Sequence, residues 1–151
     1  MLNFSEVKTS GKYQRPFSQT EKAVFYSHIV ALNNARKKVS PSIIVEHDAQ
    51  LLSSIDPKVL DYNIVALGHS LVSKNTKVTT PALAYFITPH IADLLYKYLL
   101  RTNIKSNLDA YVMNYMMKYG EYEKFNHHVL HLKDVSLGTT IDHPKGEKLN
   151  G

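Results

Sequence analysis

Three histidines lie close together near the end of the chain, at His127, His128 and His131. On a helix, residues four positions apart share a face, so His127 and His131 would point the same way. That spacing suits zinc, as in the H-E-x-x-H arrangement, but here no glutamate occupies the second position. A third ligand would have to come from elsewhere in the chain. We therefore predict a polar surface and no metal site, and leave open whether these three side chains bind a metal.

A glycine, a histidine and a serine at Gly68, His69 and Ser70 partly match the nucleophile elbow G-x-S-x-G. The second glycine of that motif is replaced by Val72, and the chain is short for the α/β sheet that carries such an elbow. Residues 67–72 also fit an apolar helical stripe through Leu67. We predict that Gly68 permits a close helix–helix approach and that Ser70 is not a nucleophile.

The carboxylates do not form an obvious acid–base pair. Glu46 and Asp48 are two positions apart, as are Glu121 and Glu123, and side chains at that spacing diverge on a helix. The sequence also lacks a P-loop and a G-x-G-x-x-G nucleotide motif. These absences predict a protein that is not an enzyme and holds no cofactor.

The positive charge is concentrated at the start of the chain. Residues 1–40 hold seven of the 18 basic side chains and two of the 13 acidic ones, so the whole net charge of +5 falls there. Such asymmetry indicates an anionic partner, although a solvated arm or cations placed at a helix C-terminus would explain it equally. The candidate residues for nucleic-acid or anion binding are Lys8, Lys12, Arg15, Lys22, Arg36, Lys37 and Lys38.

Tyrosine is abundant, with ten residues, and tryptophan is absent. Tyrosine and methionine are enriched at protein interfaces, whereas the simpler explanation of an aromatic stripe is core packing. For a helix over residues 107–119, the spacing predicts an inward stripe of Leu108, Val112, Tyr115 and Tyr119. It leaves Tyr111, Met113 and Met117 at the edges, and these three are the predicted protein interface.

Proline positions predict most of the elements. Four of the six prolines follow a serine, threonine or aspartate that would cap a helix, at Pro41, Pro57, Pro81 and Pro89. With the apolar spacing that follows, these pairs predict helices starting near residues 41, 57 and 89 and a short one over 82–87. Two capping boxes predict further helices, from Ser18 with Glu21 and from Ser106 with Asp109. Gly120 would end the last of these in the left-handed conformation.

The predicted fold is therefore an all-α, single-domain helical bundle of about five to six helices. Residues 1–17 form an irregular basic N-terminal arm, residues 18–137 the helical domain and residues 138–151 a polar C-terminal tail. Whether residues 121–137 are helix or strand stays open. The chain of 151 residues has an ordinary hydrophobic fraction of 44% and no cysteine, which excludes disulfides and cysteine-based zinc sites.

The absence of a secretory signal or an apolar run of membrane-spanning length predicts a cytoplasmic protein with no membrane association. With no catalytic motif, we predict a non-enzymatic interaction protein. It would be a subunit or accessory factor of a larger assembly, such as a viral particle or a ribonucleoprotein. The partners would be other proteins or further copies of the chain. The alternative is a nucleic-acid-binding protein that uses the basic N-terminal region.

Overall fold

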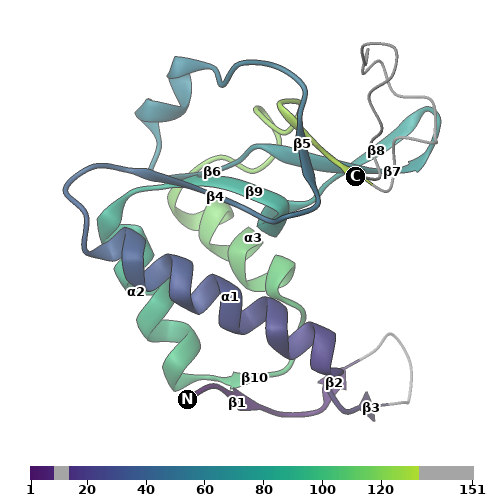
Figure 1. Cartoon of the computed structure of the whole chain (residues 1–151), viewed down its shortest axis with the longest axis vertical. Helices are drawn as coiled ribbons and strands as arrows, with labels where there is room; N and C mark the ends of the chain where they lie inside the picture. Colours follow the sequence, from purple (N-terminus) through teal and green to yellow (C-terminus); the bar gives the residue numbers. More distant parts are fainter. Residues whose placement is uncertain (9–13, 133–151) are drawn as a thin grey trace.

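The computed structural model describes residues 1–8 and 14–132, and it is a mixed α/β structure. The predicted all-α bundle, and with it the description of the chain as simply helical, is wrong. Within the described residues there are three α-helices together with several sheets. Most strands lie in the upper half of the molecule and the helices in the lower half (Figure 1). The helices are α1 (Gln19–Arg36), α2 (Pro89–Arg101) and α3 (Leu108–Tyr119).

Two sheets form the upper half. The first has three antiparallel strands in the order β4 (Ser42–Val45), β9 (Ala84–Ile87) and β6 (Ile64–Ala66). The second has the order β5 (Ala49–Leu51), β11 (Val129–His131), β7 (Gly68–Ser73) and β8 (Thr76–Thr79). In this sheet β11 runs parallel to β7, and the other neighbours are antiparallel.

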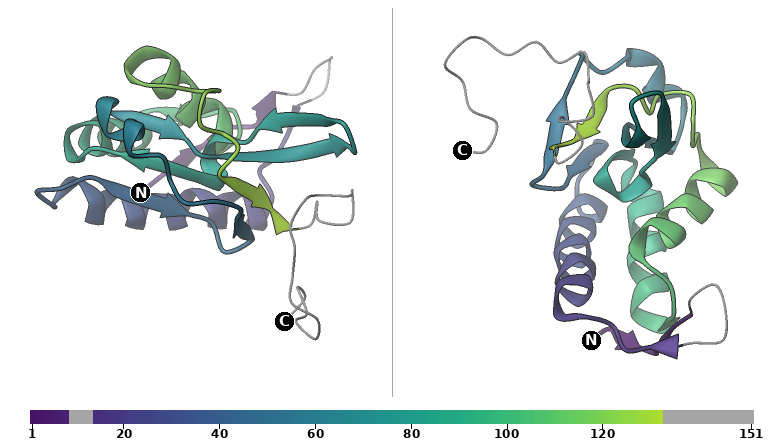
Figure 2. Two further views of the ribbon diagram at one scale, coloured as in Figure 1. Left: turned by 90° about the horizontal axis from the view of Figure 1, so that it is seen from above. Right: turned by 90° about the vertical axis from the view of Figure 1, so that its right-hand side faces the viewer.

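The first residues are not simply an irregular arm. Strand β1 (Asn3–Phe4) pairs in parallel with β10 (Asn103–Ile104), and β2 (Val7–Lys8) pairs with β3 (Gln14–Arg15). These strands lie at the lower end of the helices (Figure 1 and the right view of Figure 2). The side chains of Leu2, Val7 and Phe17 are buried. The N-terminal segment is therefore attached to the core by apolar contacts.

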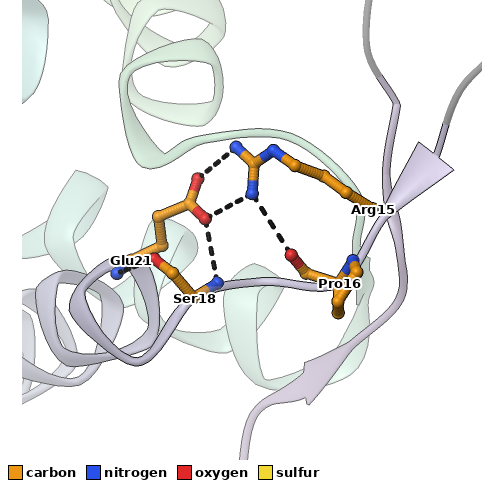
Figure 3. Close-up of polar contacts among 4 residues, drawn as sticks. All are labelled: Arg15, Pro16, Ser18 and Glu21. Atoms are coloured by element: carbon orange, nitrogen blue, oxygen red, sulfur yellow. Dashed lines mark hydrogen bonds and ion pairs between the residues drawn. The ribbon is translucent and has the colours of Figure 1, made fainter.

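The capping box that starts α1 is confirmed (Figure 3). The backbone N–H of Glu21 donates to the Ser18 hydroxyl at 3.1 Å, and the Glu21 carboxylate accepts from the Ser18 N–H at 3.0 Å. Arg15 donates two hydrogen bonds to the same carboxylate, at 2.7 and 2.9 Å. These bonds, chiefly those from Arg15, lower the pKa of Glu21 to about 2.

The predicted helix starts near residues 89 and 107 are confirmed as well. At the second of these, however, Asn107 is the cap, since its side chain accepts from the Ala110 N–H at 3.0 Å. Asp109 instead accepts a hydrogen bond from the N–H of the distant Ala82. Gly120 ends α3 with φ −155° and ψ −135°, and not in the predicted left-handed conformation.

The other proline-based helices are wrong. The chain forms strand β4 after Pro41, a short 3₁₀ helix η1 (Pro57–Asp61) after Asp56, and a 3₁₀ turn η2 (Pro81–Leu83) followed by β9. A capping residue before proline begins a tight turn as readily as an α-helix, and the following residues decide which forms. After Pro41 those residues are β-branched, which favours a strand.

The three-stranded sheet separates two apolar cores. Ile44, Tyr85 and Ile64 belong to the core that the helices cover, whereas Phe86 and Val65 belong to a smaller core with Phe125. Strands buried on both faces contain unbroken apolar runs, and these resemble the stripe of a buried helix. This explains why the pattern of residues 64–71 and 82–87 predicts helices where the chain forms strands.

Residues 121–137, which the sequence leaves open as helix or strand, do not form one element. Residues 121–128 form turns, Val129–His131 form β11, and residues 133–137 lie outside the described residues together with the predicted tail. Across residues 1–8 and 14–132, no helix has both the length and the apolar character needed to cross a membrane.

Candidate interaction surface

Four tyrosines form a continuous cluster where α2 meets α3. The ring of Tyr98 lies 6.1 Å from that of Tyr111 and 6.0 Å from that of Tyr115, and Tyr115 lies 5.6 Å from Tyr119. A surface pocket of about 420 Å³ opens beside this cluster. We call it the tyrosine pocket, and it is lined by Leu94, Tyr98, Arg101, Thr102 and Tyr115.

The helical repeat of α2 explains the composition of this pocket. Leu94, Tyr98 and Arg101 follow one another at spacings of four and three residues, so they share one face of the helix. The neighbouring face, with Ile91, Leu95 and Leu99, is buried in the core.

Tyr115 completes the pocket from α3. Its hydroxyl donates a long hydrogen bond of 3.5 Å to the Leu94 carbonyl. Burial raises the pKa of Tyr115, the neighbouring tyrosines add to this effect and Arg101 opposes it. The hydroxyl therefore stays protonated and acts as a hydrogen-bond donor.

The rim of the tyrosine pocket is basic. Arg101 is exposed, and none of the five lining residues is acidic. The pocket thus offers apolar contact area beside positive charge.

The three predicted interface residues do not share a surface. Tyr111 is half-buried, packs 6.1 Å from the Phe25 ring and accepts a hydrogen bond from the Lys105 N–H at 2.9 Å. Met113 lines a cavity on the other side of α3, and Met117 points to solvent with an exposed fraction of 69%.

The predicted inward stripe of α3 is partly wrong. Leu108 and Val112 are buried as expected, but the third buried residue is Met116. Tyr115 and Tyr119 are only half-buried at the margin of the core. The buried face therefore departs from the predicted one only in the second half of the helix, where Met116 takes the place of Tyr115, and Tyr115 becomes available as part of the tyrosine pocket.

Of the seven predicted basic residues, the five whose side chains the structure describes do not gather on one surface. Arg15 is paired with Glu21, and Arg36 is paired with Asp93 at 3.1 Å and lies 4.3 Å from the Tyr96 ring centre. The ammonium of Lys22 lies 5.7 Å from the Phe4 ring centre, while Lys37 and Lys38 are exposed. Lys8 lies in β2, and Lys12 is outside the described residues.

The described basic residues fall instead into two groups at opposite ends of α1. The helix between Lys22 and Arg36 is about 20 Å long at 1.5 Å per residue. A nucleic acid or other anion that contacted both groups at once would have to span that length. Two of the arginines already have carboxylate partners within the chain.

The three histidines do not form the predicted polar surface together, because His128 is buried. His127 is exposed, whereas His128 is buried, with Nδ1 2.8 Å from the Ser53 hydroxyl and Nε2 accepting from the Asp56 N–H at 3.3 Å. His131 contacts the Asp48 carboxylate at 2.8 Å. In the part of the chain that the structure describes, no group of three or more histidine, aspartate and glutamate side chains is arranged to hold a metal ion.

The burial of His128 predicts a pH-dependent stability. Burial and, secondarily, His127 lower the pKa of His128. As the pH falls through about 6.5, the unfolded chain takes up a proton that folded His128 does not, so the unfolded state is favoured. We expect the urea midpoint to decrease between pH 7.5 and pH 5.5, and to decrease less in His128→Gln.

The exposed His90 provides the control for this prediction. His90→Gln should show the same decrease as the unchanged protein between pH 7.5 and pH 5.5. An equal decrease in the His128→Gln variant would show that His128 is not responsible.

The Gly68-His69-Ser70 segment is part of a hairpin and not of an elbow. Strand β7 continues beyond Ser70 to Ser73, and the Ser70 hydroxyl accepts a hydrogen bond from Thr80 at 2.7 Å. The close approach at Gly68 is to Leu83 of η2, because a Cβ would lie 3.0 Å from the leucine Cδ2. The predicted helix–helix contact is therefore wrong.

None of the five residues that line the tyrosine pocket, Tyr98 and Arg101 included, is among those that the sequence predicts to be functional. The spacing of Tyr98 and Arg101 from Leu94 places all three residues on one face of α2, and this was the signal available in the sequence. Only the packing of α2 against α3 shows that this face is accessible while the neighbouring face is buried.

Compared with protein-family models, with curated proteins and with solved structures, the chain matches none of them.

Proposed function

We propose that this chain is a non-enzymatic interaction protein, a subunit of a larger assembly that uses the tyrosine pocket as its contact surface. The observation that carries the proposal is a concave surface of aliphatic and aromatic carbon with an arginine at its rim. Tyrosine and arginine are the residue types that most often dominate binding energy at protein interfaces. Because the pocket is already formed, little ordering would oppose binding.

The occupant we propose is a second copy of the chain. Leu60 in η1 has an exposed fraction of 65%, and the exposed Asp61 follows it. An apolar side chain next to a carboxylate complements an apolar pocket with Arg101 at its rim. The segment containing η1 lies above the sheets, away from α2 and α3 (Figure 1). The contact would join two different surfaces, which produces rings or filaments.

A nucleic-acid-binding function is the second candidate, favoured by the positive charge of residues 1–40 and the exposed Lys37 and Lys38. The tyrosine rings support it less. Neighbouring rings are tilted by 49° to 53° and pack against one another, so they do not present separate faces for bases.

Light scattering on the purified protein, with and without nuclease, tests both functions. We expect a mass above the monomer mass of 17.2 kDa that rises with concentration and is unchanged by nuclease. Tyr98→Ala should weaken self-association by about 10-fold or more, as expected for a central tyrosine. Met117→Ala, an exposed residue outside the pocket, should leave it unchanged.

A charge exchange identifies the contact. Arg101→Asp and Asp61→Arg should each reduce self-association. A mixture of the two variants should associate again, because the introduced aspartate of one variant then meets the introduced arginine of the other. A monomer mass at every concentration would contradict self-association. A mass that nuclease reduces would support the second candidate.

A further inference from the structure

A larger cavity of about 540 Å³ lies on the opposite side of α3 from the tyrosine pocket. Its wall combines carboxyl, hydroxyl, aromatic and imidazole groups from segments far apart in the sequence. We call it the α3–β8 cavity, and the lining residues that bear on its chemistry are Glu46, Ser70, Thr80, Asp109, Tyr122 and His131.

Asp109 lies in the first turn of α3 and turns toward η2. One carboxyl oxygen, Oδ1, accepts a hydrogen bond from the Ala82 N–H at 2.8 Å. Burial raises the pKa of Asp109 and the nearby Glu46 carboxylate raises it further, while the Ala82 N–H, His28 and His131 act in the opposite direction. Asp109 and Glu46 both line this cavity, and the Glu46 carboxylate lies near enough to act on Asp109.

Glu46 is held in place by a buried chain of hydrogen bonds. Its carboxylate lies 3.1 Å from Nε2 of His28, and Nδ1 of the same ring lies 2.8 Å from the Tyr85 hydroxyl. Because a carboxylate only accepts, Nε2 donates to it, and in the neutral ring Nδ1 accepts from Tyr85. His28 is 3% exposed and stacks on Tyr85, so the orientation of Glu46 is fixed from behind.

His131 lines the cavity and contacts the carboxylate of Asp48, a residue outside the cavity wall, at 2.8 Å. The other carboxyl oxygen of Asp48, Oδ1, is buried and has no hydrogen-bond partner among the described residues. A buried acceptor without a donor costs about 1–3 kcal/mol. His131 is thus a cavity-lining group held by a carboxylate outside the cavity wall, as Glu46 is held by His28.

We infer that the α3–β8 cavity binds an organic cation, an amine or guanidinium group at the end of a short chain. The charged head would donate hydrogen bonds to the carboxylates of Asp109 and Glu46. The Ala82 N–H holds the first carboxylate in place, and the His28 ring holds the second. The hydroxyls of Ser70 and Thr80 supply further acceptors, and the Tyr122 ring and the Met113 side chain offer apolar surface to the short chain. An anion would meet the same two carboxylates and be repelled.

The cavity and the tyrosine pocket share no lining residue, so cation binding is independent of the proposed function. The cation could be a free small molecule or a basic side chain of another protein, and both would bring the same chemistry to Asp109. A purely structural role would explain one buried carboxylate with its hydrogen bonds. It does not explain why a second carboxyl group, that of Glu46, lies on the same cavity wall, where its charge opposes ionisation of Asp109.

The test compares ligands of equal shape and different charge. Amide chemical shifts in NMR spectra are followed while butylguanidinium, or its neutral counterpart butylurea, is added to the full chain. We expect the cation to bind at least about 10-fold more tightly, because hydrogen bonds between charged groups are about twice as strong as neutral ones. The shifts should be centred on residues around the cavity. A blocked peptide with a central arginine, compared with its citrulline counterpart, shows whether a protein side chain can also enter.

Isosteric variants connect binding to the two carboxylates. Asp109→Asn keeps an oxygen for the Ala82 N–H, and Glu46→Gln keeps one for His28, so both variants should fold. Each should weaken butylguanidinium binding by about 10-fold or more, whereas Glu6→Gln, an exposed carboxylate in the N-terminal segment, should not. Equal affinities for butylguanidinium and butylurea would overturn the inference. So would unchanged binding in Asp109→Asn and Glu46→Gln, or shifts centred away from the cavity.

Discussion

Replacing Gly120 with alanine is expected to destabilise the protein strongly, although the change adds a single methyl group. A Cβ at this position would lie 1.7 Å from the Ile64 carbonyl oxygen and 2.7 Å from its carbon. Both contacts are with backbone, so no side-chain rotation relieves them. The close approach also brings two hydrogen bonds into place, from Glu121 N–H to Ile64 at 2.9 Å and from Ala66 N–H to Glu121 at 3.0 Å. We expect a loss of about 3–5 kcal/mol in the free energy of unfolding.

Gly68→Ala is the matched control for this prediction. Its Cβ would meet the flexible end of the Leu83 side chain at 3.0 Å, so the expected loss is about 1–2 kcal/mol. Urea unfolding followed by circular dichroism measures both variants. Equal losses in the two variants, or a Gly120→Ala protein as stable as the unchanged one, would show that α3 can move away from β6 at little cost.

Replacing Phe25 with alanine should cost about 3–5 kcal/mol of stability, as expected for a large aromatic ring removed from a core. Phe25 is 1% exposed, and its ring contacts those of Phe4, Phe17 and Tyr111 at centroid distances of 5.5, 6.0 and 6.1 Å. These contacts join α1 to the N-terminal segment and to α3. The variant should therefore also release residues 1–8, which limited proteolysis followed by mass spectrometry would detect.

Val30→Ala on the same helix provides the comparison. Val30 has an exposed fraction of 62%, and its truncation should change the free energy of unfolding by no more than about 0.5 kcal/mol. If Phe25→Ala lost stability while residues 1–8 kept their protection from protease, the pairing of β1 with β10 would be sufficient to hold the segment.

Both candidate sites depend on how α3 is placed. One margin of the helix carries Tyr115 toward α2, and the other carries Asp109 and Met113 toward β7 and β8. The N-terminal end is positioned by the bond from Ala82 to Asp109, and the C-terminal end by the approach of Gly120 to Ile64. A change at Gly120 should therefore alter the tyrosine pocket and the α3–β8 cavity together.

The sequence by itself determined the features that depend on neighbouring residues. The capping box of Ser18 and Glu21 starts α1 because both groups lie within one helical turn. Pro89 starts α2, and α3 begins at the predicted place although Asn107, and not the predicted Ser106, is its cap; each start is followed by an apolar stripe long enough to be buried. These interactions form within a few residues, so the local pattern contains the information needed to predict them.

The tertiary structure decided which segments after proline became strands or turns, although the β-branched residues after Pro41 already favour a strand, and it alone decided which distant side chains meet. Pro41 and Pro81 carry the same local signal as Pro89, but the residues after them pair as strands with partners elsewhere in the chain. Glu46 and Asp109 face one cavity although no local spacing relates them, because β4 and α3 both pack around η2. Contacts of this kind follow from which surfaces bury one another, and that is a property of the whole fold and not of a sequence window.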